Sequence, residues 1–174
     1  MHIIKIILIS FFCFFNIFKI HSSDDLSMIK KLLEGRYELT SWKQEGITYK
    51  YPKVSGTLVV QNDKVSFTLD NNMQIAKQSK VIGWGYYDIS KDIYNYRYFD
   101  FKKMVIENEK VTIYNDLPWK GIRKYDVNLK DNLLILKTNN GDQTWTLDEK
   151  SLVYTDKSWG KNKQQVVRVW KRIN

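Results

Sequence analysis

The chain has 174 residues, with 28 lysines and arginines against 19 aspartates and glutamates and a formal net charge of +9. Its one cysteine and both histidines, Cys13, His2 and His21, lie at the N-terminus. If that segment is removed, neither a Ser-His-Asp nor a Cys-His nucleophile can form, and the usual ligands of a zinc site are missing. The composition therefore argues against a hydrolase or metalloenzyme, and we predict no catalytic residue, no metal site and no cofactor.

The N-terminal segment has the pattern of a secretion signal. A basic start ending at Lys5 is followed by the apolar run Ile6–Phe15. This length suits the apolar region of a signal peptide, about 7 to 15 residues, and is shorter than the roughly 20 residues of a membrane-spanning helix. We predict a signal peptide over residues 1–22, cleaved after Ser22, and a secreted or periplasmic protein. An uncleaved membrane anchor is the alternative.

Residues 23–174 are enough for one domain with a sizeable core. Without cysteines its stability must come from packed apolar surface, to which the aromatic content of 14% contributes heavily. Lysines are scattered and no nucleic-acid motif is present, so we expect no nucleic-acid partner. The remaining positive charge allows a weak contact with an anionic membrane surface, which salt would screen. We expect a monomer.

The first predicted element is a short helix. Over Asp25 to Leu33, apolar side chains at Leu26, Ile29, Leu32 and Leu33 recur at helical spacing.

From Glu34 onward the chain alternates apolar and polar residues in short segments, separated by clusters of Asn, Asp, Gly and Lys. This pattern predicts β-strands. The predicted strands are 37–42, 56–60, 64–69, 81–88, 95–101, 103–107, 111–114, 123–129, 133–137, 143–147, 151–154 and 165–172. Short links favour a closed, antiparallel up-and-down barrel of about eight to ten strands, because closure removes exposed edges. The short helix would close its bottom. The predicted fold class is therefore all-β.

Four blocks of sequence, taken in order, carry a resemblance to a known family. The blocks are Gly35-Arg36-Tyr37 with Glu45-Gly46; Gly56–Val60 with Val65–Leu69; Leu117–Gly121 with Arg123 and Asp131–Leu136; and Val167–Arg172. Together they are similar to the bacterial lipocalin-like domain family, a calycin-type β-barrel, with Tyr37 in place of the family's tryptophan.

The resemblance implies that an arginine from the last strand stacks on the aromatic ring of the opening motif. In this chain the pair would be Tyr37 with Arg168 or Arg172, a cation–π contact of about 0.5 to 2 kcal/mol. It also implies a barrel that binds or carries a small hydrophobic molecule.

The candidate ligand-binding residues are mostly aromatic side chains expected to point into the barrel. They are Phe67, Trp84, Tyr86, Tyr98, Tyr114, Arg123 and Trp145. Tyrosine hydroxyls and indole N–H groups would orient an apolar ligand, and Arg123 or Arg97 would hold an anionic head group, with Arg123 favoured. The structural alternatives are a filled aromatic core and, for the arginine, a surface salt bridge.

The leading hypothesis is an exported lipocalin-like protein that binds or carries a small hydrophobic ligand without catalysis. Two alternatives stay open. One is a lipocalin-like isomerase or cyclase, in which a tyrosine or carboxylate moves a proton on an apolar substrate. The other is a solid-core barrel that binds an envelope protein or a membrane surface through its outer face.

Overall fold

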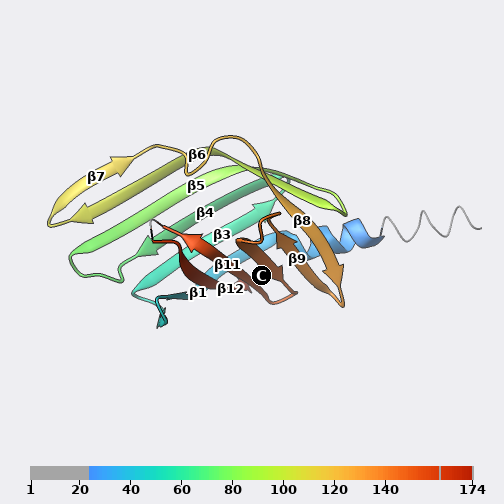
Figure 1. The fold of residues 1–174 in the computed structure, drawn as a ribbon, viewed down its shortest axis with the longest axis horizontal. Coiled ribbons are helices and arrows are strands. Elements are labelled where there is room, and N and C mark those ends of the chain that lie inside the picture. The colour runs from blue at the N-terminus through green and yellow to red at the C-terminus, as the bar shows by residue number, and fades with distance from the viewer. Residues whose placement is uncertain (1–23, 161, 174) are drawn as a thin grey trace, which may run out of the picture.

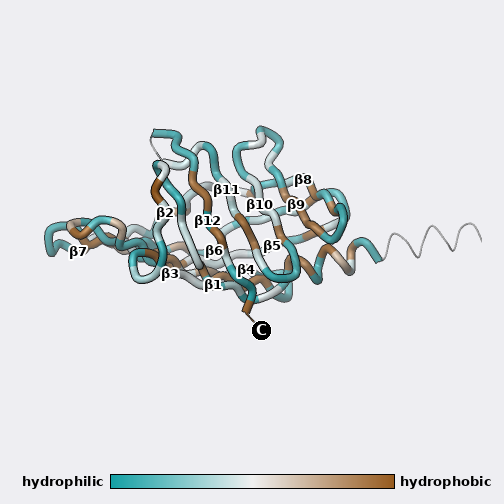
Figure 2. The backbone as a smooth tube through the Cα atoms, turned by 90° about the horizontal axis from the view of Figure 1, so that it is seen from below, coloured by the Kyte–Doolittle hydropathy of each residue, from teal (hydrophilic) through white to brown (hydrophobic). Residues whose placement is uncertain are grey.

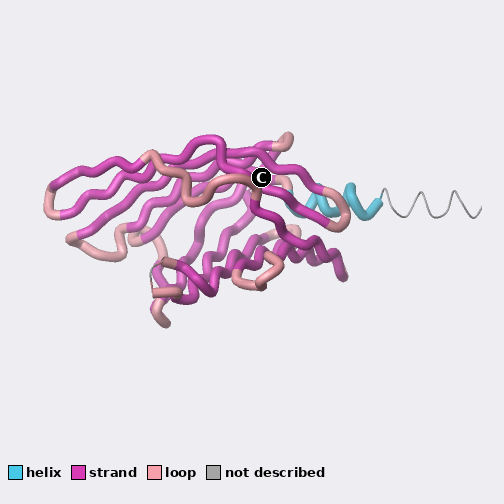
Figure 3. The backbone as a smooth tube through the Cα atoms, turned by 45° about the horizontal axis from the view of Figure 1, so that its top comes forward, coloured by secondary structure: helices cyan, strands magenta, loops and turns pink. Residues whose placement is uncertain are grey.

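The computed structural model describes residues 24–160 and 162–173. The predicted signal segment, residues 1–22, lies outside the described residues. The described chain begins with a helix over residues 24–33 and continues as twelve β-strands (Figures 1 and 3). The strands are β1 (Gly35–Gln44), β2 (Ile47–Tyr49), β3 (Val54–Gln61), β4 (Lys64–Asn71), β5 (Lys77–Ile89), β6 (Ile93–Glu107), β7 (Lys110–Tyr114), β8 (Arg123–Lys130), β9 (Leu133–Lys137), β10 (Gln143–Leu147), β11 (Ser151–Trp159) and β12 (Gln164–Ile173).

Ten of these strands form a closed antiparallel barrel. Its order is β1-β3-β4-β5-β6-β8-β9-β10-β11-β12, and β12 pairs back onto β1. In that closing pair Tyr37 lies opposite Arg172 and Trp42 lies opposite Arg168. The prediction of an all-β, up-and-down barrel with a short N-terminal helix is confirmed.

β2 and β7 lie outside the ring, and β2 and β6 correct the predicted strand list. β2 continues from the end of β1 and pairs only with it; its three residues have no long alternating pattern, and it was not predicted. β6 is one strand of 15 residues, where two separate strands over 95–101 and 103–107 were expected. It stays continuous because it pairs with β5 along nearly its whole length, across a register shift at Trp84/Gly85.

The last part of β6, from Lys103 to Glu107, pairs with β7, and this hairpin projects beyond the barrel (Figure 1).

The helix packs against the end of the barrel where β1 begins and β12 ends. Ile29, Leu32 and Leu33 are buried in the same apolar cluster as the barrel core. Arg172 stacks over the Tyr37 ring, with its Cζ 5.0 Å from the ring centroid, so the predicted aromatic–arginine contact is made by Arg172 and not by Arg168. The same guanidinium donates hydrogen bonds to backbone carbonyls at the end of the helix.

The hydrophobic residues lie mainly within the strands, and the turns are mostly hydrophilic (Figure 2). The core includes Tyr37, Tyr94 and Tyr125, all fully or almost fully buried, packed with leucines from β9, β10 and β11. The one helix of the described residues is too short to cross a membrane.

Candidate functional site: an aromatic cavity in the barrel

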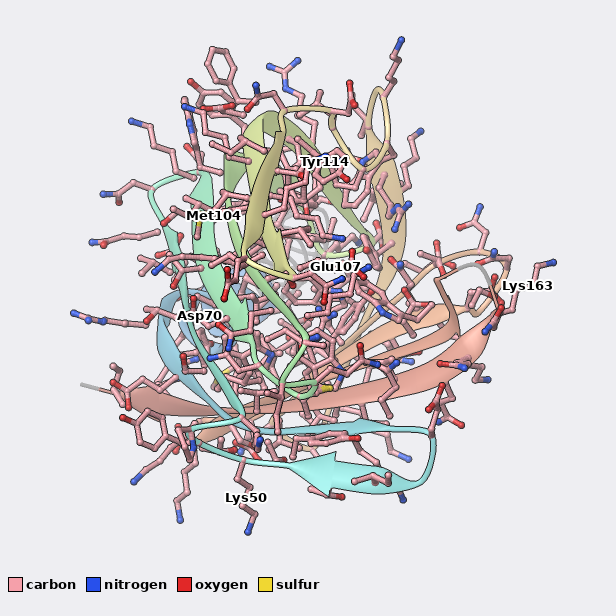
Figure 4. The ribbon with its side chains drawn as sticks, turned by 90° about the vertical axis from the view of Figure 1, so that its left-hand side faces the viewer. Lys50, Asp70, Met104, Glu107, Tyr114 and Lys163 are labelled. Atoms are coloured by element: carbon pink, nitrogen blue, oxygen red, sulfur yellow. The ribbon has the colours of Figure 1, made fainter. Side chains whose placement is uncertain are left out.

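The barrel contains a cavity of about 540 Å³. Its lining includes Gln44 at the end of β1, Asn71 at the end of β4 and Trp159 at the end of β11. These strand ends lie at the end of the barrel opposite the helix, which packs where β1 begins. Trp159 and Lys103 are also exposed, so the cavity opens to solvent at the end of the barrel opposite the helix. Figure 4 views the molecule from this end and labels Asp70 on β4, Glu107 on β6 and Lys163 in the turn before β12.

The cavity wall is dominated by aromatic rings, which come from strands around the barrel and, for Trp119, from the link between β7 and β8. The aromatic lining residues are Trp42, Phe67, Tyr96, Tyr98, Phe101, Trp119, Tyr125, Trp145, Tyr154, Trp159 and Trp170. Five of the six tryptophans of the chain therefore line this cavity. Neighbouring rings pack closely, as in the pair Tyr98 and Trp119, whose centroids are 4.3 Å apart. Such a wall offers an apolar surface with a few polar groups, as small-molecule sites do.

Four of the predicted ligand-binding residues lie together in this cavity: Phe67, Tyr98, Arg123 and Trp145. The Phe67 and Tyr98 ring centroids are 5.9 Å apart, across the β5 strand that separates their own strands. Phe67 shares its face of β4 with the buried Val65, and Tyr98 shares its face of β6 with the buried Tyr96, so both side chains point into the barrel.

Trp84 and Tyr86 lie outside the barrel, and the prediction that they point inward is wrong. On β5 the buried positions are Gly83, Gly85 and Tyr87, so Trp84 and Tyr86 occupy the outer face. There both rings pack on Phe99, at centroid distances of 4.4 and 5.9 Å.

The inner face of β5 needs glycine because rings from adjacent strands fill the space beside it. A Cβ atom on Gly83 would lie 2.8 Å from two ring atoms of Phe67 and 3.3 Å from Phe101. A residue larger than glycine would displace these rings, which are part of the cavity wall.

Tyr114 and Arg97 also lie outside the cavity. Tyr114 ends β7, which pairs with the part of β6 that projects from the barrel, and its side chain is 47% exposed. Arg97 is on the outer face of β6, with its Cζ 5.7 Å from the Tyr86 ring centroid. The expectation that Tyr114 points into the barrel is therefore wrong, and neither Tyr114 nor Arg97 lines the cavity.

Gln143 connects the polar groups on one side of the cavity. Its Oε1 accepts hydrogen bonds from Arg123 Nη1 at 2.7 Å and from the Tyr125 hydroxyl at 2.8 Å. Its Nε2 donates to Asp156 Oδ2 at 2.7 Å, and the Tyr154 hydroxyl donates to the same oxygen at 2.9 Å. Arg123 and Asp156 thus each have protein partners within this network.

Arg168 is a buried, charged lining residue that was not predicted from the sequence to bind a ligand. It is 7% exposed and lies on β12 between the buried residues Val166 and Trp170, so it shares their inner face. Its Cζ is 4.0 Å from the Trp42 ring centroid and 4.4 Å from that of Trp159. Burial lowers the pKa of its guanidinium. The signal was present in the sequence, since a residue two positions before an inward Trp170 faces the same way.

The cavity tyrosines are held in their neutral form. Burial raises the pKa of Tyr98 and of Tyr125 to about 12, and it raises the pKa values of Tyr96 and Tyr154 further. A phenol with so high a pKa is a hydrogen-bond partner at neutral pH and a poor general base.

Within residues 24–160 and 162–173, no three His, Cys, Asp or Glu side chains are grouped as metal ligands would be. No family model, curated protein or solved structure matches the chain. The lipocalin-like resemblance accordingly stays a prediction, and the barrel and its cavity are the observations that bear on function.

Proposed function

We propose that the protein is exported through its N-terminal segment and that its barrel binds a small, largely apolar molecule in the aromatic cavity without catalysing a reaction on it. The cavity carries this proposal. Its volume of about 540 Å³ falls within the roughly 300 to 1,000 Å³ of small-molecule sites, and its wall combines many apolar rings with few polar groups. An opening at the end away from the helix gives a ligand a route in.

The cavity favours this proposal over a solid-core barrel that works only through its outer face. Such a barrel requires an interior filled by side chains, as small barrels often have. Here the rings of Tyr98, Trp145 and Trp170 border a space instead of closing it. Binding of an apolar ligand would remove both its own surface and these rings from water.

The isomerase or cyclase alternative has less support. Proton abstraction near neutral pH needs a base with a pKa close to 7. The raised pKa of Tyr98 and Tyr125 makes either phenol unsuited to that task. The Asp156 carboxylate already accepts hydrogen bonds from Gln143 and Tyr154 and is not itself part of the cavity wall.

Two adjacent residues of β5 provide a matched test. Val81 lines the cavity, whereas Ile82 lies on the outer face and is 49% exposed. In V81W the added ring occupies ligand space, while I82W adds the same ring outside. We expect V81W to bind a fluorescent apolar dye, displaceable by dodecanol, at least about tenfold more weakly than I82W or the parent protein. Equal affinities in all three proteins, or no dye binding by the parent, would contradict the proposal.

A further inference from the structure

The buried side-chain polar atoms of the cavity wall that have no partner among the described residues are all hydrogen-bond donors. Among the described residues, no acceptor pairs with Nε or Nη2 of Arg168 or with Nε1 of Trp42, Trp119 and Trp145, and all of these atoms are buried. Each of these four residues lines the cavity. Buried donors are normally paired, so a set of unpaired donors around one cavity indicates a site for a group that accepts hydrogen bonds.

The two unpaired nitrogens of Arg168 lie on the same edge of its guanidinium. The Nε–H and Nη2–H bonds are parallel, and that spacing matches the two oxygens of a carboxylate. Arg168 therefore keeps free the edge that suits side-on, two-point binding of an oxyanion.

No protein carboxylate in the described part of the chain forms an ion pair with this cation, although the charge of Asp156 acts on it from a longer distance. The ion pairs there join Lys31 to Glu149, Lys77 to Glu107 and Lys80 to Asp70, and none includes Arg168.

The other buried charge, Asp156, is held by Gln143, by the Tyr154 hydroxyl and by the backbone N–H of Ser158. Arg168 is left with the faces of aromatic rings, which attract its charge but accept no hydrogen bond along its edge. Burying a guanidinium without an acceptor along its edge costs free energy unless a bound anion supplies that acceptor.

On the basis of the proposed function, we infer that the ligand of this cavity is an apolar molecule with a carboxylate, and that Arg168 binds the carboxylate through its Nε–Nη2 edge. The apolar part lies against the aromatic wall towards Phe67 and Tyr98. Trp159 covers Arg168 from the mouth of the cavity and is 36% exposed, so a rotation of this ring lets the head group reach the edge. Arg123, whose Nη1 already donates to Gln143, is not the anchor.

Calorimetric titrations with dodecanoate and dodecanol test this inference, at a pH where the acid is ionised. The two probes share an apolar chain and differ in the head group. We expect the parent protein to bind dodecanoate at least about tenfold more tightly than dodecanol, as a charged two-point hydrogen bond should give. R168M should bind both probes equally, with the dodecanol affinity of the parent. R97M, which removes an arginine on the outer face, should keep the full preference for the acid.

Arg168→Lys provides a second test, because it keeps the charge and removes the planar edge. It replaces R168M in the comparison if R168M does not fold. Its preference for dodecanoate should fall below that of the parent. An unchanged preference in R168M, or in R168K where R168M does not fold, would place the anchor elsewhere and overturn the inference. Equal binding of the two probes to the parent protein would overturn it while leaving the proposed function intact. If neither probe binds, the proposed function itself fails.

Discussion

Replacing Arg172 with methionine should remove the clamp that holds the helix against the closing seam of the barrel. The guanidinium donates to Glu34 O at 2.5 Å, to the Tyr37 hydroxyl at 2.7 Å and to Leu32 O, and it stacks on the Tyr37 ring. Methionine keeps the apolar part of the side chain and loses all of these contacts. The Leu32 carbonyl retains the Tyr37 hydroxyl as a partner at 3.0 Å, so Glu34 O is the acceptor that is left unpaired.

The size of the effect can be estimated from these contacts. A hydrogen bond to a charged group contributes about 1.5 to 3 kcal/mol, and a cation–π contact at a partly exposed site about 0.5 to 1 kcal/mol. Arg172 is half-buried, which reduces each contribution, and the contacts are not additive. We expect R172M to lower the free energy of unfolding by about 3 kcal/mol. For a domain of this size the loss corresponds to about 6 to 12 °C in Tm.

Urea unfolding followed by tryptophan fluorescence measures this loss, with a thermal scan by circular dichroism as a second readout. The neighbouring Lys171 is exposed and provides the control, because K171M removes a cation of the same strand without touching the helix. K171M should change the free energy of unfolding by no more than about 0.5 kcal/mol. If R172M loses no more free energy of unfolding than K171M does, Arg172 does not hold the helix to the barrel.

Three further predictions concern packing, ionisation and processing. Gly85→Ala should lower the free energy of unfolding by about 3 kcal/mol or more, because a Cβ there would lie 1.9 Å from the Arg97 carbonyl oxygen; urea unfolding with a parent-like midpoint would contradict this. The pKa of Tyr98 and of Tyr125 is about 12 in the folded protein and about 10 in an unfolded chain. The stability that these two neutral phenols contribute is therefore fully present below pH 10. It should then fall between about pH 10 and 12, by up to about 1.4 kcal/mol per pH unit for each tyrosine, and a flat pH profile of urea unfolding in that range would exclude it. The secreted protein should have the intact mass of residues 23–174, whereas a full-length mass would indicate a retained anchor.

The fold could be predicted from the sequence because alternation along a strand is a local property. Segments such as Lys64–Leu69 and Leu133–Lys137 have period-two patterns bounded by turn residues, and both are strands at nearly the expected bounds. The continuity of β6 could not be predicted in the same way. It depends on pairing with β5, which is a contact between segments and is not visible in the pattern of either one.

The cavity was only partly predictable, since alternation separates two faces without saying which is inside. For β5 the larger side chains, Trp84 and Tyr86, suggested the inner face, but the Phe67 ring on the next strand leaves room inside only for Gly83. Arg168 was overlooked as a ligand-binding residue for the opposite reason, because a charged residue on a strand usually faces solvent.

The tryptophans themselves report on whether an apolar molecule enters the aromatic cavity. Trp42, Trp119, Trp145, Trp159 and Trp170 line the cavity, and Trp84 lies on the outer face as an internal control. The most direct measurement follows the six indole N–H resonances of isotope-labelled tryptophan during a titration with dodecanol. We predict saturable shifts of the cavity indoles, with the Trp84 resonance unmoved. A titration that shifts none of the six resonances, or that shifts the Trp84 resonance most, would contradict binding inside the cavity.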